Sequence, residues 1–331
     1  MLKECGVRLC DEYDLAMLDL DGVVYIGSTA VEGAPGHLDA ASSAGMHLAY
    51  ITNNASRPPS VVAEHLRVLG VAAKDEDVVT SAQAAARLVA GEVPAGSAVY
   101  VIGGVGLFEA LAEHDLAAVQ SISDEPAAVV SGYHPDLLWK TVLNGAILVR
   151  RGLPWVASNL DLTVPTPHGP GPGNGVLVEA VARYAGREPV VAGKPERPLF
   201  DETVRRVGGE HPLVVGDRLD TDIEGAVNSG LDSLLVMTGV TGLAELAGAG
   251  PGARPSYICA DLAGLSTAHP VPTVGDQSAL NGWAARVDEN RLVVEGEGGV
   301  DDWWRVVASA AWKHLDTAGA PVDVSAVAVP E

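Results

Sequence analysis

Two carboxylates, Asp19 and Asp21, stand two residues apart just after the apolar run 15–18, and Gly22 follows them. If that run is a buried parallel strand, its carboxyl end places both acids in the crevice where open α/β sheets bind ligands. One acid can then act as a nucleophile and the other as a proton donor. An Asp-Gly pair between apolar runs is also a strong hairpin signal, so a simple turn is the alternative.

Two further polar groups directly follow apolar runs. Thr52 and Asn53 end the run 47–52 and continue into Asn54. A hydroxyl, an amide and backbone N–H groups at a strand end before a helix suit phosphate oxygens, although a polar turn has the same composition. Lys194, one of five lysines, follows the run 189–192. A lysine in this position is either solvated or placed to meet an anion.

A third group of acids follows the run 213–216. Asp217 comes at the expected strand end, and Asp220 and Asp222 lie just beyond it. Carboxylate oxygens are the ligands that hard divalent cations prefer, and the spacing differs from that of a calcium loop of the EF-hand type. Asp222 can equally cap the helix that follows, and the two roles are compatible.

Apolar runs alternate with helix-like stretches along most of the chain, which is typical of βαβ units and a parallel sheet. We therefore predict an α/β fold with a Rossmann-like parallel-sheet core. The candidate strands cover residues 15–20, 47–52, 98–102, 127–131, 155–158, 189–192, 213–216, 233–237 and 256–259.

About 140 residues separate Thr52 from Lys194, far more than one crossover helix requires. Besides the run 189–192, which leads to Lys194, three of the candidate strands and their helices lie between them. We therefore predict a catalytic core formed by residues 1–81 and 187–268, with a second α/β domain inserted at 82–186.

The last part of the chain differs in pattern. Residues 268–274 have the composition of a linker, and a hairpin is expected at 284–287 and 291–295. One amphipathic helix follows, and four of the six tryptophans lie beyond residue 280. So much aromatic surface needs a packing partner, so we expect residues 275–331 to form a small, docked α+β extension.

Composition excludes several classes of protein. Apolar residues make up 47% of the 331 residues, which indicates a globular chain. The net charge of −22 argues against binding to nucleic acid or to an anionic membrane surface. The three cysteines, Cys5, Cys10 and Cys259, have no metal-ligand spacing, and the N-terminus has no apolar signal region. We therefore expect a soluble cytoplasmic protein.

The order and the strand-end placement of these motifs over residues 10–265 resemble the haloacid dehalogenase-like superfamily of aspartate-nucleophile phosphatases. The strings around Asp19, Thr52, Lys194 and Asp217 are most similar to those of the NagD and p-nitrophenyl phosphatase branch. The composition and the C-terminal segment also resemble the glycerol-3-phosphate phosphatases of high-GC bacteria.

This resemblance implies a role for each motif. Asp19 would be the nucleophile that forms an aspartyl-phosphate, and Asp21 the acid–base. The phosphate would be held by Thr52, Asn53 and Lys194. Mg²⁺ would be ligated by Asp19, the backbone carbonyl of Asp21 and Asp217, with Asp222 in support. A carboxylate and a phosphate at ~4 Å repel by about 4 kcal/mol per charge pair. The positive charges of a metal ion and of the lysine would offset this repulsion.

In the family, the inserted domain is a cap that excludes bulk water and selects the substrate. Residues 157–161, which include Asn159 and Asp161, resemble a family string and could address the hydroxyls of a substrate; a strand-end turn is the alternative. His134 stands where relatives often carry an acid, so it could contact the substrate or lie on the surface. Residues 172–175 are typical of a helix entry.

The resemblance implies a small phosphorylated metabolite as the substrate, first of all glycerol 3-phosphate. Pyridoxal phosphate, phosphoglycolate and nucleoside monophosphates are the alternatives within phosphatase chemistry. A phosphotransferase acting through the same intermediate, or a non-catalytic sensor of phosphorylated metabolites, are the alternatives outside it. The resemblance also implies a homodimer.

Overall fold

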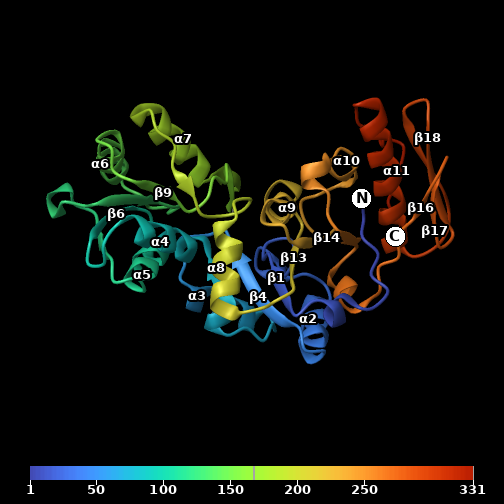
Figure 1. The fold of residues 1–331 in the computed structure, drawn as a ribbon, viewed down its shortest axis with the longest axis horizontal. Coiled ribbons are helices and arrows are strands. Elements are labelled where there is room, and N and C mark those ends of the chain that lie inside the picture. Colours follow the sequence, from blue (N-terminus) through green and yellow to red (C-terminus); the bar gives the residue numbers. More distant parts are fainter. Residues whose placement is uncertain (167, 331) are drawn as a thin grey trace. The chain divides into compact units, whose positions relative to one another are not determined.

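The computed structural model describes residues 1–166 and 168–330, which form two compact units. The first unit contains Met1–Leu48, Leu69–Ala72 and Gly209–Glu331, and the second contains Ala49–Val68 and Ala73–Gly208. In Figure 1 the first unit is drawn mainly in dark blue and in orange to red, and the second mainly in cyan to yellow. The predicted α/β class is confirmed in both units.

The first unit contains four parallel strands in the order β15-β14-β13-β1. Every residue of β1 is buried, as expected for a strand covered on both faces. Because β1 pairs in parallel with β13, Asp21 and Gly22 do not form the turn of a hairpin with β1. The bounds are β1 Leu15–Leu18, β13 Pro212–Gly216, β14 Asp232–Val236 and β15 Tyr257–Cys259.

Short elements connect these strands. Two small strands, β2 and β3, form a hairpin after β1, and a π-helical turn at Leu219–Ile223 leads into α9. Helix α9 ends at Gly230, whose left-handed conformation suits glycine. The bounds are α1 Leu9–Glu12, β2 Tyr25–Ile26, β3 Thr29–Ala30, α2 Ala34–Ser43, α9 Glu224–Ser229 and α10 Leu243–Ala247, with 3-10 turns at Pro251–Ala253 and Leu262–Ser266.

The C-terminal extension is an antiparallel sheet in the order β16-β17-β18-β19, which lies against the long helix α11 (Figure 1). The expected hairpin and helix are confirmed. Trp303 and Trp312 of α11 are buried in one core cluster with Leu246 and Ile258. The extension therefore packs on its own chain. The bounds are β16 Thr273–Val274, β17 Ser278–Leu280, β18 Trp283–Asp288, β19 Arg291–Gly296 and α11 Val300–Ala318.

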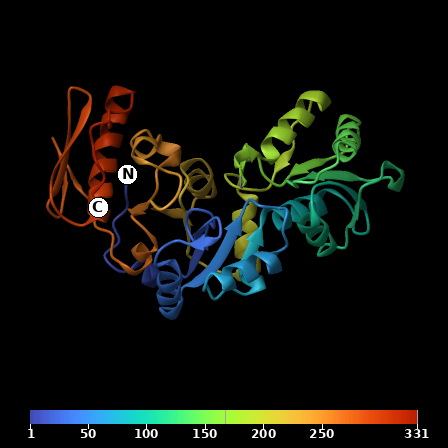
Figure 2. The same cartoon turned by 180° about the vertical axis from the view of Figure 1, so that it is seen from behind.

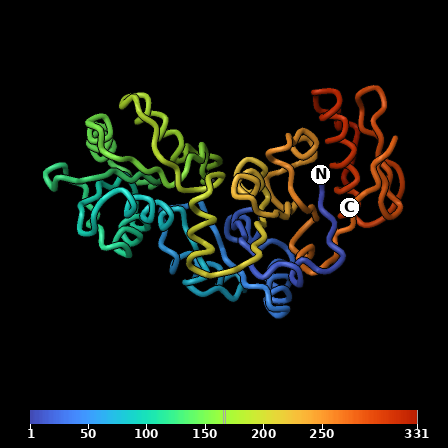
Figure 3. The backbone as a smooth tube through the Cα atoms, in the orientation of Figure 1, coloured from blue at the N-terminus to red at the C-terminus, as the bar shows by residue number. Residues whose placement is uncertain are grey.

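The expected linker at 268–274 is instead a docked segment. His269 is 1% exposed, and its backbone exchanges two hydrogen bonds with Cys5 near the N-terminus. Its ring contacts the carbonyl oxygen of Gly264 and the guanidinium of Arg305 on α11. The two chain ends lie close to α11 (Figure 3).

The second unit contains the parallel pair β4 and β5 and a parallel sheet in the order β12-β9-β8-β6-β7. Helices α6 and α7 pack together on one face of this sheet, and α4 and α5 on the other (Figures 1 and 2). Thr80 caps α4 through the reciprocal bonds of a capping box with Gln83. The antiparallel pair β10–β11 precedes α7.

The elements of the second unit alternate as the sequence predicts, and α7 begins at Asn174, within the expected helix entry. Among the described residues, no helix has the length and apolar character needed to cross a lipid bilayer. The bounds are β4 His47–Thr52, α3 Pro59–Val68, β5 Val78–Thr80, α4 Ser81–Glu92, β6 Ala98–Ile102, α5 Val105–Ala112, β7 Ala117–Val119, β8 Ala128–Ser131, α6 Trp139–Arg150, β9 Trp155–Ala157, β10 Thr163–Thr166, β11 Gly169–Pro172, α7 Asn174–Ala185, β12 Val190–Val191 and α8 Pro198–Val207, with 3-10 turns at Asp75–Asp77 and Ile122–Asp124.

Candidate active site

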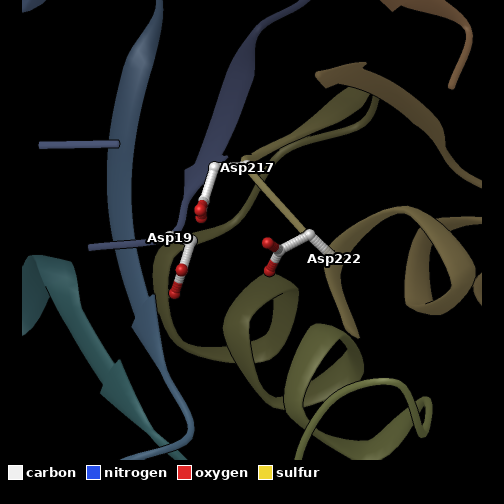
Figure 4. A group of neighbouring side chains, drawn as sticks. All are labelled: Asp19, Asp217 and Asp222. Atoms are coloured by element: carbon white, nitrogen blue, oxygen red, sulfur yellow. The ribbon is translucent and has the colours of Figure 1, made fainter. Parts of the chain in front are cut away.

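Three carboxylates converge in the first unit. Asp19 directly follows β1 and Asp217 directly follows β13, and the parallel register aligns Leu18 with Val215. Asp222 projects from the π-helical turn beyond Asp217. Oxygen atoms of these three side chains lie within 4.8 Å of one another, and Figure 4 shows them facing a common space. The predicted site residues therefore lie together at the edge of the sheet where the parallel strands β1 and β13 end.

Backbone donors orient two of these acids. Oδ2 of Asp217 accepts a hydrogen bond from the N–H of Val240 at 2.7 Å, and Oδ2 of Asp222 accepts one from the N–H of Arg218 at 3.1 Å. Asp217 and Asp222 are fully buried, whereas Asp19 is partly exposed. Burial fixes the first two carboxylates, and partial exposure leaves Asp19 accessible to a ligand.

Glycines make room for this cluster. A Cβ atom on Gly22 would lie 2.5 Å from Oδ2 of Asp217, and one on Gly239 would lie 2.0 Å from the same atom. A Cβ atom on Gly216 would lie 2.2 Å from Cβ of Asp222. Any larger residue at these three positions would displace a carboxylate.

The donor set fits Mg²⁺. All three side chains offer carboxylate oxygens, the ligands that this hard cation prefers, and the glycines shape a cradle that holds Asp217 in place. Two carboxylate charges at ~4 Å repel by about 4 kcal/mol at an effective dielectric constant near 20. A divalent cation among the three would convert this repulsion into attraction.

The remaining acids of the two motifs lie differently. Asp21 is exposed and pairs through its backbone with Tyr25, so its side chain lies outside the group of three. Asp220, a candidate ligand from its spacing, instead forms a two-pronged ion pair with Arg218, at 3.0 and 2.7 Å. The group of three converging carboxylates therefore includes Asp217 and Asp222 but not the side chain of Asp220.

The loop after β14 also lines this group of acids, although none of the sequence motifs described above includes it. The Thr238 hydroxyl donates to the carbonyl oxygen of Gly22 at 2.6 Å, and Gly239 and Val240 contact Asp217. The signal was present, because a threonine and a glycine directly follow the predicted strand 233–237. The rule that parallel strands present ligands at their carboxyl ends applies to this strand as well.

In the second unit, Asn53 holds the backbone of Lys194. Oδ1 of Asn53 accepts from the N–H of Lys194 at 2.8 Å, and Nδ2 donates to the carbonyl oxygen of Lys194 at 3.0 Å. Asn53 and Lys194 are 8% and 3% exposed. The hydroxyl of Thr52 accepts from the N–H of Asn54 at 3.1 Å. The two predicted phosphate motifs are thus joined by direct hydrogen bonds.

The predicted specificity residues Asn159 and Asp161 belong to the same network. Nδ2 of Asn159 donates to the carbonyl oxygen of Asn53 at 2.6 Å, and Nδ2 of Asn53 donates to Oδ1 of Asp161 at 3.0 Å. The hydroxyl of Ser81 donates to the carbonyl oxygen of Asn53 at 2.6 Å. Asn159 is only 3% exposed, so its side chain is buried among the groups to which it is hydrogen-bonded.

His134 lies three positions beyond the end of β8, at the edge where β6 and β9 also end. Its ring is partly exposed, and Nδ1 accepts from the N–H of Asp136 at 3.2 Å. A Cβ atom on Gly104, which follows β6, would lie 2.5 Å from the ring. Glycine at this position lets the imidazole pack against the end of the strand.

Comparisons with known proteins agree with this arrangement. Residues 16–117 match the family described as haloacid dehalogenase-like hydrolase, and residues 191–265 match the one described as HAD-hydrolase-like. The chain is 41% identical to a D-glycerol 3-phosphate phosphatase of Mycobacterium tuberculosis, over 92% of this chain and 87% of that protein.

Solved structures extend the likeness to the fold. A glycerol phosphate phosphatase from Mycobacterium tuberculosis, solved with magnesium, has a TM-score of 0.84 and 40% identity, over 93% of this chain and 92% of that one. A 4-nitrophenylphosphatase from Thermotoga maritima has a TM-score of 0.72 and 27% identity, covering 78% and 98% of the two chains. With its strand-end carboxylates and its likeness to these phosphatases over nearly its whole length, the chain belongs to the haloacid dehalogenase-like hydrolases.

Proposed function

We propose that this chain is a Mg²⁺-dependent phosphomonoesterase that hydrolyses glycerol 3-phosphate through an aspartyl-phosphate. The observation that carries this proposal is the convergence of Asp19, Asp217 and Asp222 on one space, with Asp19 the accessible member. The similarity to phosphatases over 92% of the chain supports the same chemistry.

Asp19 and Asp21 divide the chemical work in this proposal. A carboxylate oxygen of Asp19 forms a bond to phosphorus while the bond from phosphorus to the ester oxygen breaks, and Asp21 gives its proton to the departing alkoxide. Asp21 then takes a proton from a water molecule whose oxygen attacks the phosphorus. Inorganic phosphate leaves, Asp19 is restored as a carboxylate, and Asp21 is again protonated.

Thr52, Asn53 and Lys194 would hold the phosphoryl group. The side-chain amide of Asn53 is already bonded to Lys194, so the backbone N–H of Asn53 is its natural contribution. The hydroxyl of Thr52 and the ammonium group of Lys194 supply a donor and a positive charge. The order of the motifs along the chain and their likeness to the family support this assignment.

Mg²⁺ would be held by Asp19, the backbone carbonyl of Asp21 and Asp217, with Asp222 in support. When bound, it supplies positive charge that offsets the repulsion between Asp19 and the phosphate oxygens. Within the protein, the N–H groups of Val240 and Arg218 keep Asp217 and Asp222 in position for this task.

Glycerol 3-phosphate is the proposed substrate because a relative at 41% identity is a D-glycerol 3-phosphate phosphatase. We propose that residues 82–186 form the cap that selects it, with His134 at the sheet edge facing the non-phosphate part. Pyridoxal phosphate, phosphoglycolate and UMP are the competing substrates.

Phosphate release from these four compounds, measured with Mg²⁺ and with EDTA, tests the proposal. We expect glycerol 3-phosphate to be preferred, EDTA to abolish turnover, and Asp19→Asn to lower kcat by at least about a thousandfold. Weak and equal rates on all four compounds would contradict the substrate. No activity on any would favour a sensor, and phosphate passed to an added polyol would favour a phosphotransferase.

We also propose a homodimer. Leu138, just before α6, and Trp139 and Leu143 of α6 are exposed at 70%, 73% and 45%, and exposed apolar side chains of this size commonly mark an interface. Light scattering should give twice the chain mass of 34.0 kDa, and Trp139→Glu should give the single-chain mass.

A cytoplasmic location is proposed on the chemistry of the cysteines. Cys5, Cys10 and Cys259 are all free and buried, as is usual where thiols stay reduced. Fractionation of the cells that make the protein should recover it with the cytoplasmic fraction.

A further inference from the structure

We propose that Asp161 and Asn159 are positioning residues for Lys194, rather than residues that contact the non-phosphate part of the substrate. This inference rests on the proposed phosphatase activity. It changes what the loop 158–161 does: the loop would set the efficiency of the phosphate site for every substrate, and would not select among substrates.

The side-chain amide of Asn53 is the centre of the argument. Lys194 offers it both an N–H and a carbonyl oxygen, at 2.8 and 3.0 Å, so the orientation of the amide is fixed by its own partners. Only one hydrogen of Nδ2 then remains, and Oδ1 of Asp161 accepts it at 3.0 Å. The carboxylate of Asp161 therefore accepts the last free hydrogen of the amide that holds the backbone of Lys194.

Asn159 is committed in the same way. Its Nδ2 donates to the carbonyl oxygen of Asn53 at 2.6 Å and to the hydroxyl of Ser158 at 3.3 Å. Its Oδ1 accepts from the N–H of Asp161 at 3.2 Å. Both donor hydrogens and the acceptor are in use, and the residue is 3% exposed. A side chain with these commitments has no donor left for a substrate hydroxyl.

Glycines lock the loop between its neighbours. A Cβ atom on Gly193 would lie 2.5 Å from Oδ1 of Asn53 and 2.5 Å from the carbonyl oxygen of Ser158. On the other side, Cβ atoms on Gly173 and Gly175 would lie 2.2 Å from the carbonyl oxygens of Asp161 and Leu160. The residue before Lys194 and the start of α7 thus hold the loop 158–161 at close range.

The network has a mechanical consequence. Loss of the acceptor on Asp161 leaves a buried N–H of Asn53 without a partner, and Asn53 is the residue that fixes both backbone polar groups of Lys194. We expect the side chain of Asn53 to shift in response, and the backbone of Lys194 to shift with it. In the proposed function this lysine meets the phosphoryl group common to all substrates.

Asp161→Ala and Asp161→Asn test the inference, with glycerol 3-phosphate and p-nitrophenyl phosphate as parallel substrates. We expect Asp161→Ala to lower kcat for both by about ten- to a hundredfold. The ratio of the two kcat/KM values should stay within about twofold of the original protein. Asp161→Asn keeps an acceptor oxygen for Asn53 and should retain kcat within about threefold. Inorganic phosphate, titrated by calorimetry, should bind more weakly to Asp161→Ala than to Asp161→Asn.

Asp124→Ala, which removes an exposed carboxylate elsewhere in the same unit, is the matched control and should change neither rate. If Asp161→Ala does not fold, Asn159→Asp replaces it, because it exchanges the donor to Asn53 for an acceptor at equal size. A selective loss with glycerol 3-phosphate, with p-nitrophenyl phosphate turnover intact, would overturn the inference. So would an Asp161→Asn variant as impaired as Asp161→Ala. An original protein that turns over neither compound would instead overturn the proposed function.

Discussion

Gly22 lies so close to Asp217 that a Cβ atom at position 22 would be 2.5 Å from Oδ2 of the carboxylate. Its φ of +86° is in the left-handed region that favours glycine. The residue after the two N-terminal acids therefore shapes the site of a third acid, almost two hundred residues further along the chain.

Gly22→Ala should weaken Mg²⁺ binding, because the new methyl group must displace Asp217. We expect the Mg²⁺ concentration for half-maximal activity to rise by about ten- to a hundredfold, as is usual when a residue that orients a ligand is changed. Gly27→Ala is the control, since Gly27 also has a positive φ of +62° but no atom within 4 Å of a Cβ atom. Equal effects of the two substitutions would show that backbone strain alone is responsible.

The hydroxyl of Thr238 should matter for activity, because it donates to the carbonyl oxygen of Gly22 at 2.6 Å. Thr238→Val keeps the shape but removes the donor, and should lower kcat/KM by about fivefold through a loss near 1 kcal/mol. Thr238→Ser restores the donor and should recover most of the activity. A Thr238→Ser variant no better than Thr238→Val would assign the effect to the methyl group instead.

The C-terminal helix should unfold together with the first unit. Nε1 of Trp312, which is 2% exposed, donates to the carbonyl oxygen of Leu246 at 2.8 Å. Trp312→Phe leaves that buried oxygen without its donor, and should lower the free energy of unfolding by about 1–3 kcal/mol in urea titrations. Trp283→Phe also removes a bond to a carbonyl oxygen, that of Gly299, but at an exposed site. Its effect should be under about 0.5 kcal/mol.

His269 should make the stability depend on pH. Burial lowers the pKa of its imidazole from 6.5 to about 4, and the neighbouring Arg305 acts in the same direction. Because Nε2 donates to the carbonyl oxygen of Gly264, Nδ1 is the acceptor for Arg305, and a second ring proton would face that guanidinium. The neutral imidazole is therefore the form that the folded state accommodates.

The unfolded chain binds this proton below pH 6.5 and the folded one only near pH 4, so stability falls as pH decreases through that window. Between pH 7.5 and pH 5 the loss due to His269 should be about 2 kcal/mol. Urea titrations at both pH values should show a smaller loss for His269→Gln. Equal losses in the two proteins would assign the pH dependence to other groups.

The sequence by itself determined the secondary-structure elements and which polar residues stand at the ends of the strands. Parallel strands buried on both faces are continuous apolar runs, so β1, β4 and β13 could be recognised locally, and the polar residues at their ends followed from the same rule. The docking of the C-terminal helix was also predictable, because tryptophans on one helical face require a partner.

Only the tertiary structure decided which polar groups remain available to a ligand. Asp220 and Asp222 are both aspartates just beyond the same strand, and the sequence alone does not distinguish them. In the structure Asp220 is paired with Arg218, whereas Asp222 faces Asp19 and Asp217. Asn159 is recognisable in the sequence as a polar residue after a strand, but only the folded chain shows that its side-chain amide bonds to the carbonyl oxygen of Asn53 and to the N–H of Asp161. These outcomes depend on contacts between residues up to about two hundred positions apart, and such contacts exist only after the chain has folded.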